Sequence, residues 1–228
     1  MSPALYLTRA KLRRDPAIAT IAALLLPTAI SSRTQTSHQL VWSLFAGDEN
    51  AKRDFLWRED QHGTFYVLSA APPGESPVFE TETKIFAPVL TKGDCLRFSL
   101  RANATRSVKT QGAKRGKRAD VVMAALNKVP REERAAARPG LILETGRAWL
   151  EAQGARNGFD VVGSTALRVE GYETLKLPRV NAKPIQISWL DFEGVLTVTD
   201  PVLFLKAITE GFGHARAFGC GLMLIRRA

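Results

Sequence analysis

Residues 187–227 read ISWLDFEGVLTVTDPVLFLKAITEGFGHARAFGCGLMLIRR and carry most of the information about the fold. The first part is rich in β-branched and aromatic residues and predicts a strand over 185–199. Asp200 followed by Pro201 is typical of a helix start, because aspartate caps the first turn and proline fits the first helical position. We therefore expect a helix over 201–210 and, from the apolar run that closes the chain, a last strand.

Four glycines form two G-x-G pairs between that helix and the last strand, namely Gly211, Gly213, Gly219 and Gly221. Glycine adopts positive φ and lets a backbone approach a ligand closely, so the stretch is either a binding loop or a turn into a buried strand. It does not match G-x-G-x-x-G, no G-K-[ST] occurs in the chain, and the stretch precedes a strand instead of opening a helix. Dinucleotide and P-loop sites are therefore excluded.

The segments upstream supply the other elements of a repeating order. Alternating apolar residues predict a long strand over 95–108. The periodic sequence LILETGRAWLEAQ predicts a helix over 141–153 that ends at Gly154, and a further strand is expected over 159–177. With the elements of 185–227, the order becomes strand, helix, strand, strand, helix, strand. This is the order of a ferredoxin-like βαββαβ unit.

The first part of the chain predicts another α+β unit. Its expected elements are strands over 4–12, 63–71 and 83–90, and helices over 16–26, 38–45 and 51–59. We therefore expect an α+β fold of two tandem ferredoxin-like domains, spanning residues 1–90 and 91–228. No internal repeat is visible in the residues themselves.

The charge balance points to the kind of partner. The chain holds 32 lysine and arginine residues against 22 aspartate and glutamate residues, which gives a net charge of +10. Such a surplus favours nucleic acid or an acidic membrane face, although charge that serves only solubility gives the same count. The apolar stretch 17–30 is too short for a spanning helix and contains Pro27, so we expect no membrane segment.

The cysteines and histidines argue against a metal centre. Cys95 and Cys220 lie far apart without C-x-x-C spacing, and the three histidines are spread singly. The cysteines indicate buried thiols in a reducing compartment, and hence a cytoplasmic protein. Because suitable zinc ligands are lacking, we predict no metal and no other cofactor.

His38 is the strongest candidate for a catalytic side chain. Thr36 and Gln39 form a T-x-x-Q capping box after a polar linker over 28–37, which places His38 in the first turn of the next helix. There the helix dipole disfavours imidazolium, and a neutral imidazole serves as a general base. On RNA such a base deprotonates a 2′-hydroxyl, which attacks the adjacent phosphate. The residues alone favour the simpler alternative, a histidine that only caps the helix or forms a hydrogen bond.

Basic residues gather in the second half of the chain. A segment predicted to be an exposed loop holds Lys109, Lys114, Arg115, Lys117 and Arg118, and a predicted hairpin holds Lys176, Arg179 and Lys183. Arg216 lies between the two glycine pairs. Such clusters either bind nucleic acid or simply face solvent.

Five pieces of the sequence, in order and nearly end to end, resemble the CasE family, the CRISPR repeat-processing endoribonucleases of subtype I-E. They are SHQLVWSLF (37–45), KRDFLWRE (52–59), LRFSLRANATRSV (96–108), FEGVLTV (192–198) and GFGHARAFGCGL (211–222). Each piece alone is a weak signal, but the combination is specific. The resemblance implies two tandem ferredoxin-like (RRM-like) domains that bind the hairpin of the repeat RNA.

The resemblance also implies an activity. Members of the family cut precursor crRNA at the 3′ base of the stem without a metal, and leave a 2′,3′-cyclic phosphate or 3′-phosphate and a 5′-hydroxyl. They then stay on the mature crRNA as a subunit of the Cascade complex. The family's catalytic histidine falls on His38. Where some members have a tyrosine three residues earlier, this chain has Gln35, so either Arg33, Thr36 or Ser37 positions the phosphate or His38 acts nearly alone.

For RNA binding, the resemblance assigns the stem to the basic loop 109–118 and to the hairpin lysines and arginine. Arg33 is assigned to the phosphate at the catalytic site, and Arg216 to RNA phosphates beside the backbone amides of the glycine pairs. One alternative stays open, a non-catalytic RRM-like RNA-binding subunit of a ribonucleoprotein. That protein keeps every basic residue and reduces His38 to a helix-capping side chain.

Overall fold

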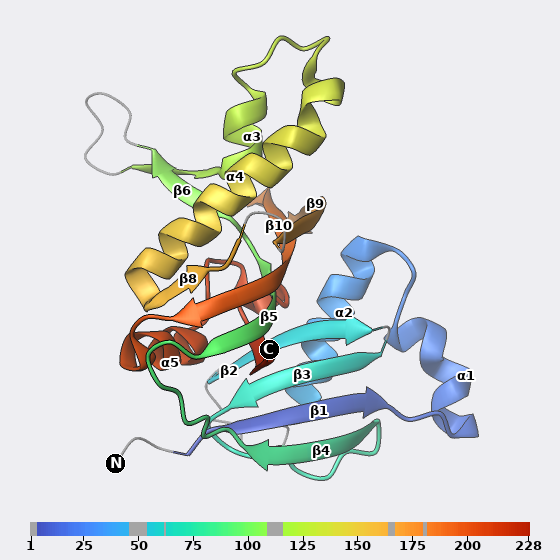
Figure 1. The fold of residues 1–228 in the computed structure, drawn as a ribbon. Helices are drawn as coiled ribbons and strands as arrows, with labels where there is room; N and C mark the ends of the chain where they lie inside the picture. Colours follow the sequence, from blue (N-terminus) through green and yellow to red (C-terminus); the bar gives the residue numbers. More distant parts are fainter. Residues whose placement is uncertain (1–3, 46–53, 62, 109–115, 164–166, 180–181) are drawn as a thin grey trace.

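The computed structural model describes residues 4–45, 54–61, 63–108, 116–163, 167–179 and 182–228. They form two antiparallel sheets that follow one another along the chain, one within residues 6–85 and one within residues 95–227. Figure 1 shows the first sheet and its helices next to the second sheet. The long helix of the second half lies on the side of the second sheet that is away from the first. The fold is the α+β arrangement that the sequence predicts.

The first sheet has the strand order β2-β3-β1-β4. Its strands are β1 (Tyr6–Leu12), β2 (Phe55–Gln61), β3 (Thr64–Ser69) and β4 (Phe79–Ile85), and the helices α1 (Pro16–Leu25) and α2 (Ile30–Ser43) connect β1 to β2. All neighbouring strands are antiparallel, as βαββαβ connectivity requires. The segment 70–78 between β3 and β4 contains no helix, so this sheet lacks the second crossover helix of a complete ferredoxin-like unit.

The second sheet has the complete pattern. Its strands are β5 (Cys95–Ala102), β8 (Phe159–Val161), β9 (Arg168–Arg179), β10 (Ala182–Val198) and β11 (Met223–Arg227), with the helices α4 (Arg134–Asn157) and α5 (Pro201–Glu210). The strand order is β11-β5-β10, and both β8 and β9 pair with β10. Between β5 and α4 the chain adds a hairpin, β6 (Thr105–Val108) with β7 (Lys117–Asp120), and the short helix α3 (Val121–Leu126).

Aspartate side chains close two helix starts, and the sequence predicts the cap at Asp200. The Asp15 carboxylate accepts the Ile18 N–H at 3.0 Å at the start of α1. One oxygen of Asp200 accepts the N–H groups of Val202 and Leu203 at 2.9 and 3.0 Å at the start of α5. These bonds satisfy donors that have no partner within the helix, and so they fix where each helix begins.

The helix predicted over 51–59 is wrong, because the described part of that range belongs to strand β2. Phe55 and Trp57 pack with Phe65 in the core of the first sheet, whereas Leu56 packs into the core of the second sheet. Three consecutive apolar residues therefore face two different cores. A strand buried on both faces has this pattern, and over so short a run periodicity does not distinguish it from a helix.

The predicted capping box at Thr36 is also wrong. Helix α2 begins at Ile30, so the predicted linker 28–37 is largely helical, and His38 lies beyond the first turn. The Thr36 hydroxyl donates to the Ser32 carbonyl at 2.9 Å, and the Thr34 hydroxyl donates to the Ile30 carbonyl at 2.8 Å. These bonds to the preceding turn satisfy the hydroxyls inside the helix, and the polar run therefore continues as helix.

Several element bounds also differ from the prediction, and the strand predicted over 159–177 is divided into β8 and β9. Helix α4 continues past Gly154 and ends before Gly158, which has a φ of 74°. A Cβ on Gly154 would lie 2.3 Å from the Phe159 carbonyl oxygen, so this glycine serves close packing and not helix termination. The strand predicted over 95–108 is divided into β5 and β6, and the strand predicted over 83–90 is β4, which ends at Ile85.

The two sheets share a core and one buried polar contact. Leu56 and Leu68 of the first sheet belong to the same apolar cluster as Leu100 and Phe192 of the second. Arg58, only 7% exposed, donates from Nη1 to the Ser99 hydroxyl at 2.8 Å. Helix α2 of the first half also lies against β9 and the 3-10 helix η1 (Arg216–Phe218) of the second half. The predicted boundary between residues 90 and 91 stays a prediction.

Candidate active site

His38 lies in the middle of α2, next to Trp42 of the same helix and Trp57 of strand β2. The Trp42 indole Nε1 donates to His38 Nε2 at 3.2 Å. The imidazole also stacks on Trp57, with ring centroids 6.5 Å apart and an angle of 26° between the ring planes. The side chain is partly exposed. Because Nε2 accepts a hydrogen bond, it carries the lone pair that a general base needs.

The dipole argument made for His38 from the sequence is wrong. The field of a helix terminus falls off within the first turn, and His38 follows Ile30, the first residue of α2, by two turns. The indole N–H of Trp42, one turn further along α2, donates to the ring instead. The i, i+4 spacing of His38 and Trp42 was visible in the sequence and is the signal that could have found this partner.

A cleft of about 320 Å³ opens beside His38, between the two sheets. We call it the central cleft. From the first half it is lined by Ile30, Arg33, Thr34, Ser37, Trp57, Glu59 and Asp60, and from the second half by Arg101, Gly171, Glu173, Trp189, Asp191, Phe218 and Gly219. Ser37 precedes His38 in the chain and Trp57 stacks on its ring, so two residues that line the cleft adjoin the imidazole, which is not itself among the lining residues.

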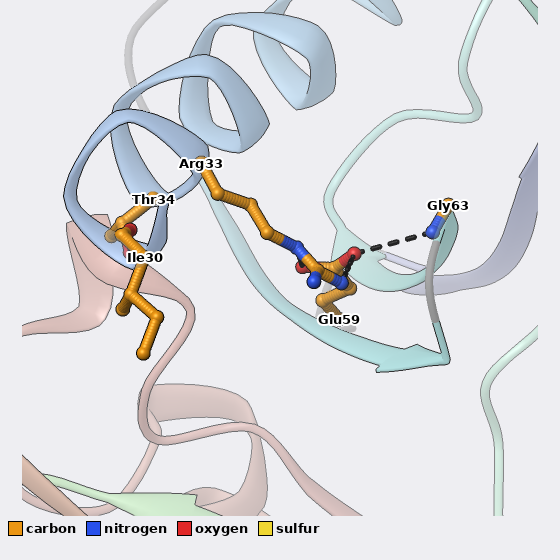
Figure 2. A network of polar contacts seen from close by, with 5 residues as sticks. All are labelled: Ile30, Arg33, Thr34, Glu59 and Gly63. Atoms are coloured by element: carbon orange, nitrogen blue, oxygen red, sulfur yellow. Dashed lines mark hydrogen bonds and ion pairs between the residues drawn. The ribbon is translucent and has the colours of Figure 1, made fainter. Parts of the chain in front are cut away.

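Arg33 is the one predicted RNA-binding cation that lies at the central cleft among the described residues. Figure 2 shows its side chain reaching from α2 to Glu59 on β2. Its Nε and Nη2 lie 3.1 and 2.6 Å from the two Glu59 oxygens, and the Gly63 N–H donates to Glu59 Oε1 at 3.2 Å. Arg33 thus forms a bidentate ion pair with Glu59. Its predicted contact with RNA requires a phosphate to share or replace Glu59.

The opposite wall of the central cleft carries a second ion pair. Arg101 binds Asp191 through two hydrogen bonds of 2.8 and 2.7 Å. Asp60 and Glu173 add negative charge. The cleft is therefore not a strongly basic surface. Ser37 is different, since its hydroxyl is buried at the cleft and has no hydrogen-bond partner among the described residues.

The glycine stretch is a turn into a buried strand, as one of the two predicted alternatives requires. All four glycines have positive φ, and Leu222 and Met223 after them are buried. A Cβ on Gly219 would lie 3.1 Å from the Trp57 ring, and a Cβ on Gly213 would lie 2.8 Å from the Asn103 carbonyl oxygen. Packing alone therefore requires glycine here. Phosphate binding by this stretch stays a prediction.

Replacing Gly219 tests this packing. We expect Gly219→Ala to lower the free energy of unfolding by about 1 to 3 kcal/mol through its φ of 77°. We expect a further loss of about 1 kcal/mol or more because the new methyl group crowds Trp57. Gly93→Ala is the control, since Gly93 has a φ of 94° and no atom within 4 Å of the place that a methyl group would take. Equal losses in urea unfolding would show that the contact with Trp57 is unimportant.

The remaining predicted cations lie away from the central cleft or outside the described residues. Arg118 is exposed on β7, Lys176 is exposed on β9, and Arg216 donates from Nη2 to the Gly211 carbonyl at 3.0 Å. Arg179 is the last residue of β9, Lys183 lies near the start of β10, and Lys117 lies on β7. Lys109, Lys114 and Arg115 fall outside the described residues. Their roles in RNA binding stay predictions.

Metal ligands and membrane spans are both absent from the part of the chain that the structure describes. Within it, no three or more histidine, cysteine, aspartate or glutamate side chains gather as metal ligands. No helix in the described ranges combines the length and the apolar character needed to cross a membrane.

Comparison with known proteins gives a consistent set of relatives. A family model described as "CRISPR associated protein" matches residues 5–227. The CRISPR system Cascade subunit CasE of Escherichia coli strain K12 is 25% identical over 195 residues, which cover 82% of this chain and 88% of that protein.

Solved structures show the same fold. The CRISPR endoribonuclease Cse3 bound to 19 nt RNA has a TM-score of 0.67 and 23% identity, covering 99% of this chain and 100% of that chain. Thermus thermophilus Cse3, bound to an RNA representing a pre-cleavage complex, also has a TM-score of 0.67, with 22% identity and coverages of 98% and 99%. The prediction of two tandem ferredoxin-like units is thereby confirmed.

Proposed function

Because the chain belongs to the CasE family of CRISPR-associated proteins, we propose that it is a metal-independent endoribonuclease for CRISPR repeat RNA. Its substrate is the precursor crRNA, which it binds by the repeat hairpin and cuts at the 3′ base of the stem. The relatives include a Cascade subunit and an endoribonuclease bound to RNA, which supports both the substrate and retention of the product in a Cascade complex. Both cysteines are free thiols, in keeping with a cytoplasmic place of action, although only Cys220 is buried as predicted and Cys95 is exposed.

The observation that carries this proposal is the placement of His38. Its Nε2 accepts a hydrogen bond from Trp42, and its neighbours Ser37 and Trp57 line the central cleft. In the reaction, the 2′-hydroxyl of the nucleotide before the cut takes the place of the indole as donor to Nε2. His38 then accepts the proton as the 2′-oxygen attacks the adjacent phosphorus. The 5′-oxygen leaves as its bond to phosphorus breaks and takes a proton from water, so that the products are a 2′,3′-cyclic phosphate and a 5′-hydroxyl.

Groups around His38 are suited to hold the phosphate. The Ser37 hydroxyl is buried at the central cleft without a partner among the described residues, so it has a hydrogen bond to offer a phosphate oxygen. Arg33 supplies charge if the phosphate displaces part of its ion pair with Glu59. Gln35 is exposed and stands where some family members have a tyrosine. The structure thus supports a site with His38 as base and without a phenolic acid at that position.

The rival function is an RNA-binding subunit without catalysis, and incubation with the repeat hairpin in EDTA separates the two. We expect cleavage at the 3′ base of the stem, because neither the base nor the nucleophile requires a metal. A hairpin that is bound but stays uncut would favour the rival. Addition of Mg²⁺ after EDTA is the control, and a reaction that starts only then would contradict metal independence.

A further inference from the structure

A second hollow, which we call the basic groove, lies on the helix side of the second sheet. Its volume is about 770 Å³, and its walls are the β6–β7 hairpin, α3, α4 and the glycine stretch. Val121, Leu141 and Trp149 contribute to an apolar lining. The cations that line it are Arg106, Arg118, Lys128 and Arg156, and one carboxylate, Glu144, lies among them.

The four cations of the basic groove are available to a ligand. All four are exposed, and within the described parts of the chain none forms an ion pair with a carboxylate. The Arg156 Nε donates to the Ala152 carbonyl of its own helix. The groove also influences its neighbour His214, because partial desolvation and then the charges of Arg118 and Arg216 lower the pKa of that side chain. These observations indicate a positive potential.

The glycine stretch connects the basic groove to the central cleft. Gly213 and His214 line the basic groove, whereas Phe218 and Gly219 line the central cleft. The two hollows also approach each other at the end of β5. Arg101, near the end of that strand, lines the cleft, and Thr105, at the start of β6, lines the groove. A bridge between Asn103 and His214 fixes the stretch to that end of the strand. A strand of RNA can therefore run from His38 over this stretch into the groove.

We propose that the basic groove binds a single-stranded RNA segment that flanks the repeat hairpin. This rests on the proposed function, since it concerns the same substrate. An A-form duplex is contacted across its backbone and shallow minor groove, and its stacked bases cannot enter a hollow between a hairpin and a helix. A single strand can, with its phosphates on the four cations and its bases on the apolar lining. The excess of cations disfavours an uncharged peptide as the occupant.

The test compares three RNAs that carry a 2′-deoxy nucleotide at the cut and so stay intact: the bare hairpin, the hairpin with a 5′ flank, and the hairpin with a 3′ flank. The variant is Lys128→Ala/Arg156→Ala. We expect wild-type protein to bind one flanked RNA more tightly than the bare hairpin, and the variant to lose that gain. For two lost contacts to a single strand, the slope of log Kd against log salt falls by about 1.4, and affinity at 0.1 M salt falls by about tenfold or more.

The control is Lys84→Ala/Lys92→Ala, which removes two exposed cations outside both hollows. It should leave binding of all three RNAs unchanged, and thermal unfolding checks that both variants are folded. An equal loss on the bare hairpin would place the stem in the groove and overturn the proposal. Unchanged affinity for every RNA would overturn it too and leave the proposed function standing. Failure of wild-type protein to bind any of the RNAs would overturn both.

Discussion

The variant His38→Ala should slow cleavage of the repeat hairpin by about 10² to 10⁴-fold, the range that general-base catalysis contributes. The reason is that His38 Nε2 takes the 2′-hydroxyl proton in the proposed reaction. Affinity for the RNA should stay within about twofold, because a neutral imidazole contributes no charge to phosphate binding. Single-turnover rates and Kd values, measured on the same hairpin, give the two quantities separately.

Gln39→Ala is the matched control for that variant. Gln39 is the next residue of α2 and is exposed, so its truncation disturbs the helix to a similar degree without touching the imidazole. It should retain wild-type rate and affinity. If His38→Ala also retains the wild-type rate, His38 is not the base. If it loses affinity and rate in equal proportion, His38 contributes to binding instead of catalysis.

A 2′-deoxy substitution at the nucleotide before the cut should stop the reaction altogether. The proposed nucleophile is the 2′-oxygen itself, and without it no other group of the RNA can form the cyclic phosphate. The modified hairpin should still bind with nearly the wild-type Kd and inhibit cleavage of unmodified RNA. Single-turnover cleavage, followed over times at which the unmodified hairpin is fully cut, measures the effect.

The control RNA carries the 2′-deoxy substitution one nucleotide downstream of the cut. This hairpin should be cleaved at the normal rate, because its nucleophile is intact. Cleavage of the first RNA would mean that water or a side chain attacks the phosphate. His38 would then not deprotonate the 2′-hydroxyl, and its role as a base would be limited to activating that other nucleophile.

The sequence made His38 the leading catalytic candidate, and the physical reason that it gave for that choice is wrong. The capping-box prediction assumed that a run of serine and threonine is a linker, whereas the hydroxyls of Thr34 and Thr36 bond to the preceding turn and the run is helical. Local sequence does not decide between these outcomes, because the same hydroxyls serve a cap or a helix interior. The resemblance to a family located the histidine, and only the structure shows that Trp42 and Trp57 hold it.

Tertiary contacts also determine that residues 55–61 form strand β2 and not a helix. Phe55, Leu56 and Trp57 form an apolar run whose local pattern fits a helix and a strand equally well. The choice follows from the second sheet, which supplies a core for Leu56 on the face opposite to Phe55 and Trp57. Helix starts that a local side chain marks agree better between sequence and structure. Asp15 and Asp200 mark helix starts in the sequence because a carboxylate satisfies backbone donors within a few residues.

Neither hollow could be predicted from the sequence. The central cleft combines α2 and β2 with residues far later in the chain, and the basic groove combines the β6–β7 hairpin with α4 and the glycine stretch. Charge clustering in the sequence pointed to Arg118, which lines the groove. It could not point to Lys128 or Arg156, because Lys128 stands in a mixed run with Glu132 and Glu133, Arg156 is a single cation in its segment, and only the fold brings the two together.

The chemistry of the product ends, formed by wild-type protein in EDTA, tests the central claim most directly. Mass spectrometry of the cleaved hairpin reports both ends at once. We predict an upstream fragment that ends in a 2′,3′-cyclic phosphate, or the 3′-phosphate formed from it, and a downstream fragment that begins with a 5′-hydroxyl. An upstream 3′-hydroxyl with a downstream 5′-phosphate would contradict attack by the 2′-hydroxyl, and with it the role proposed for His38.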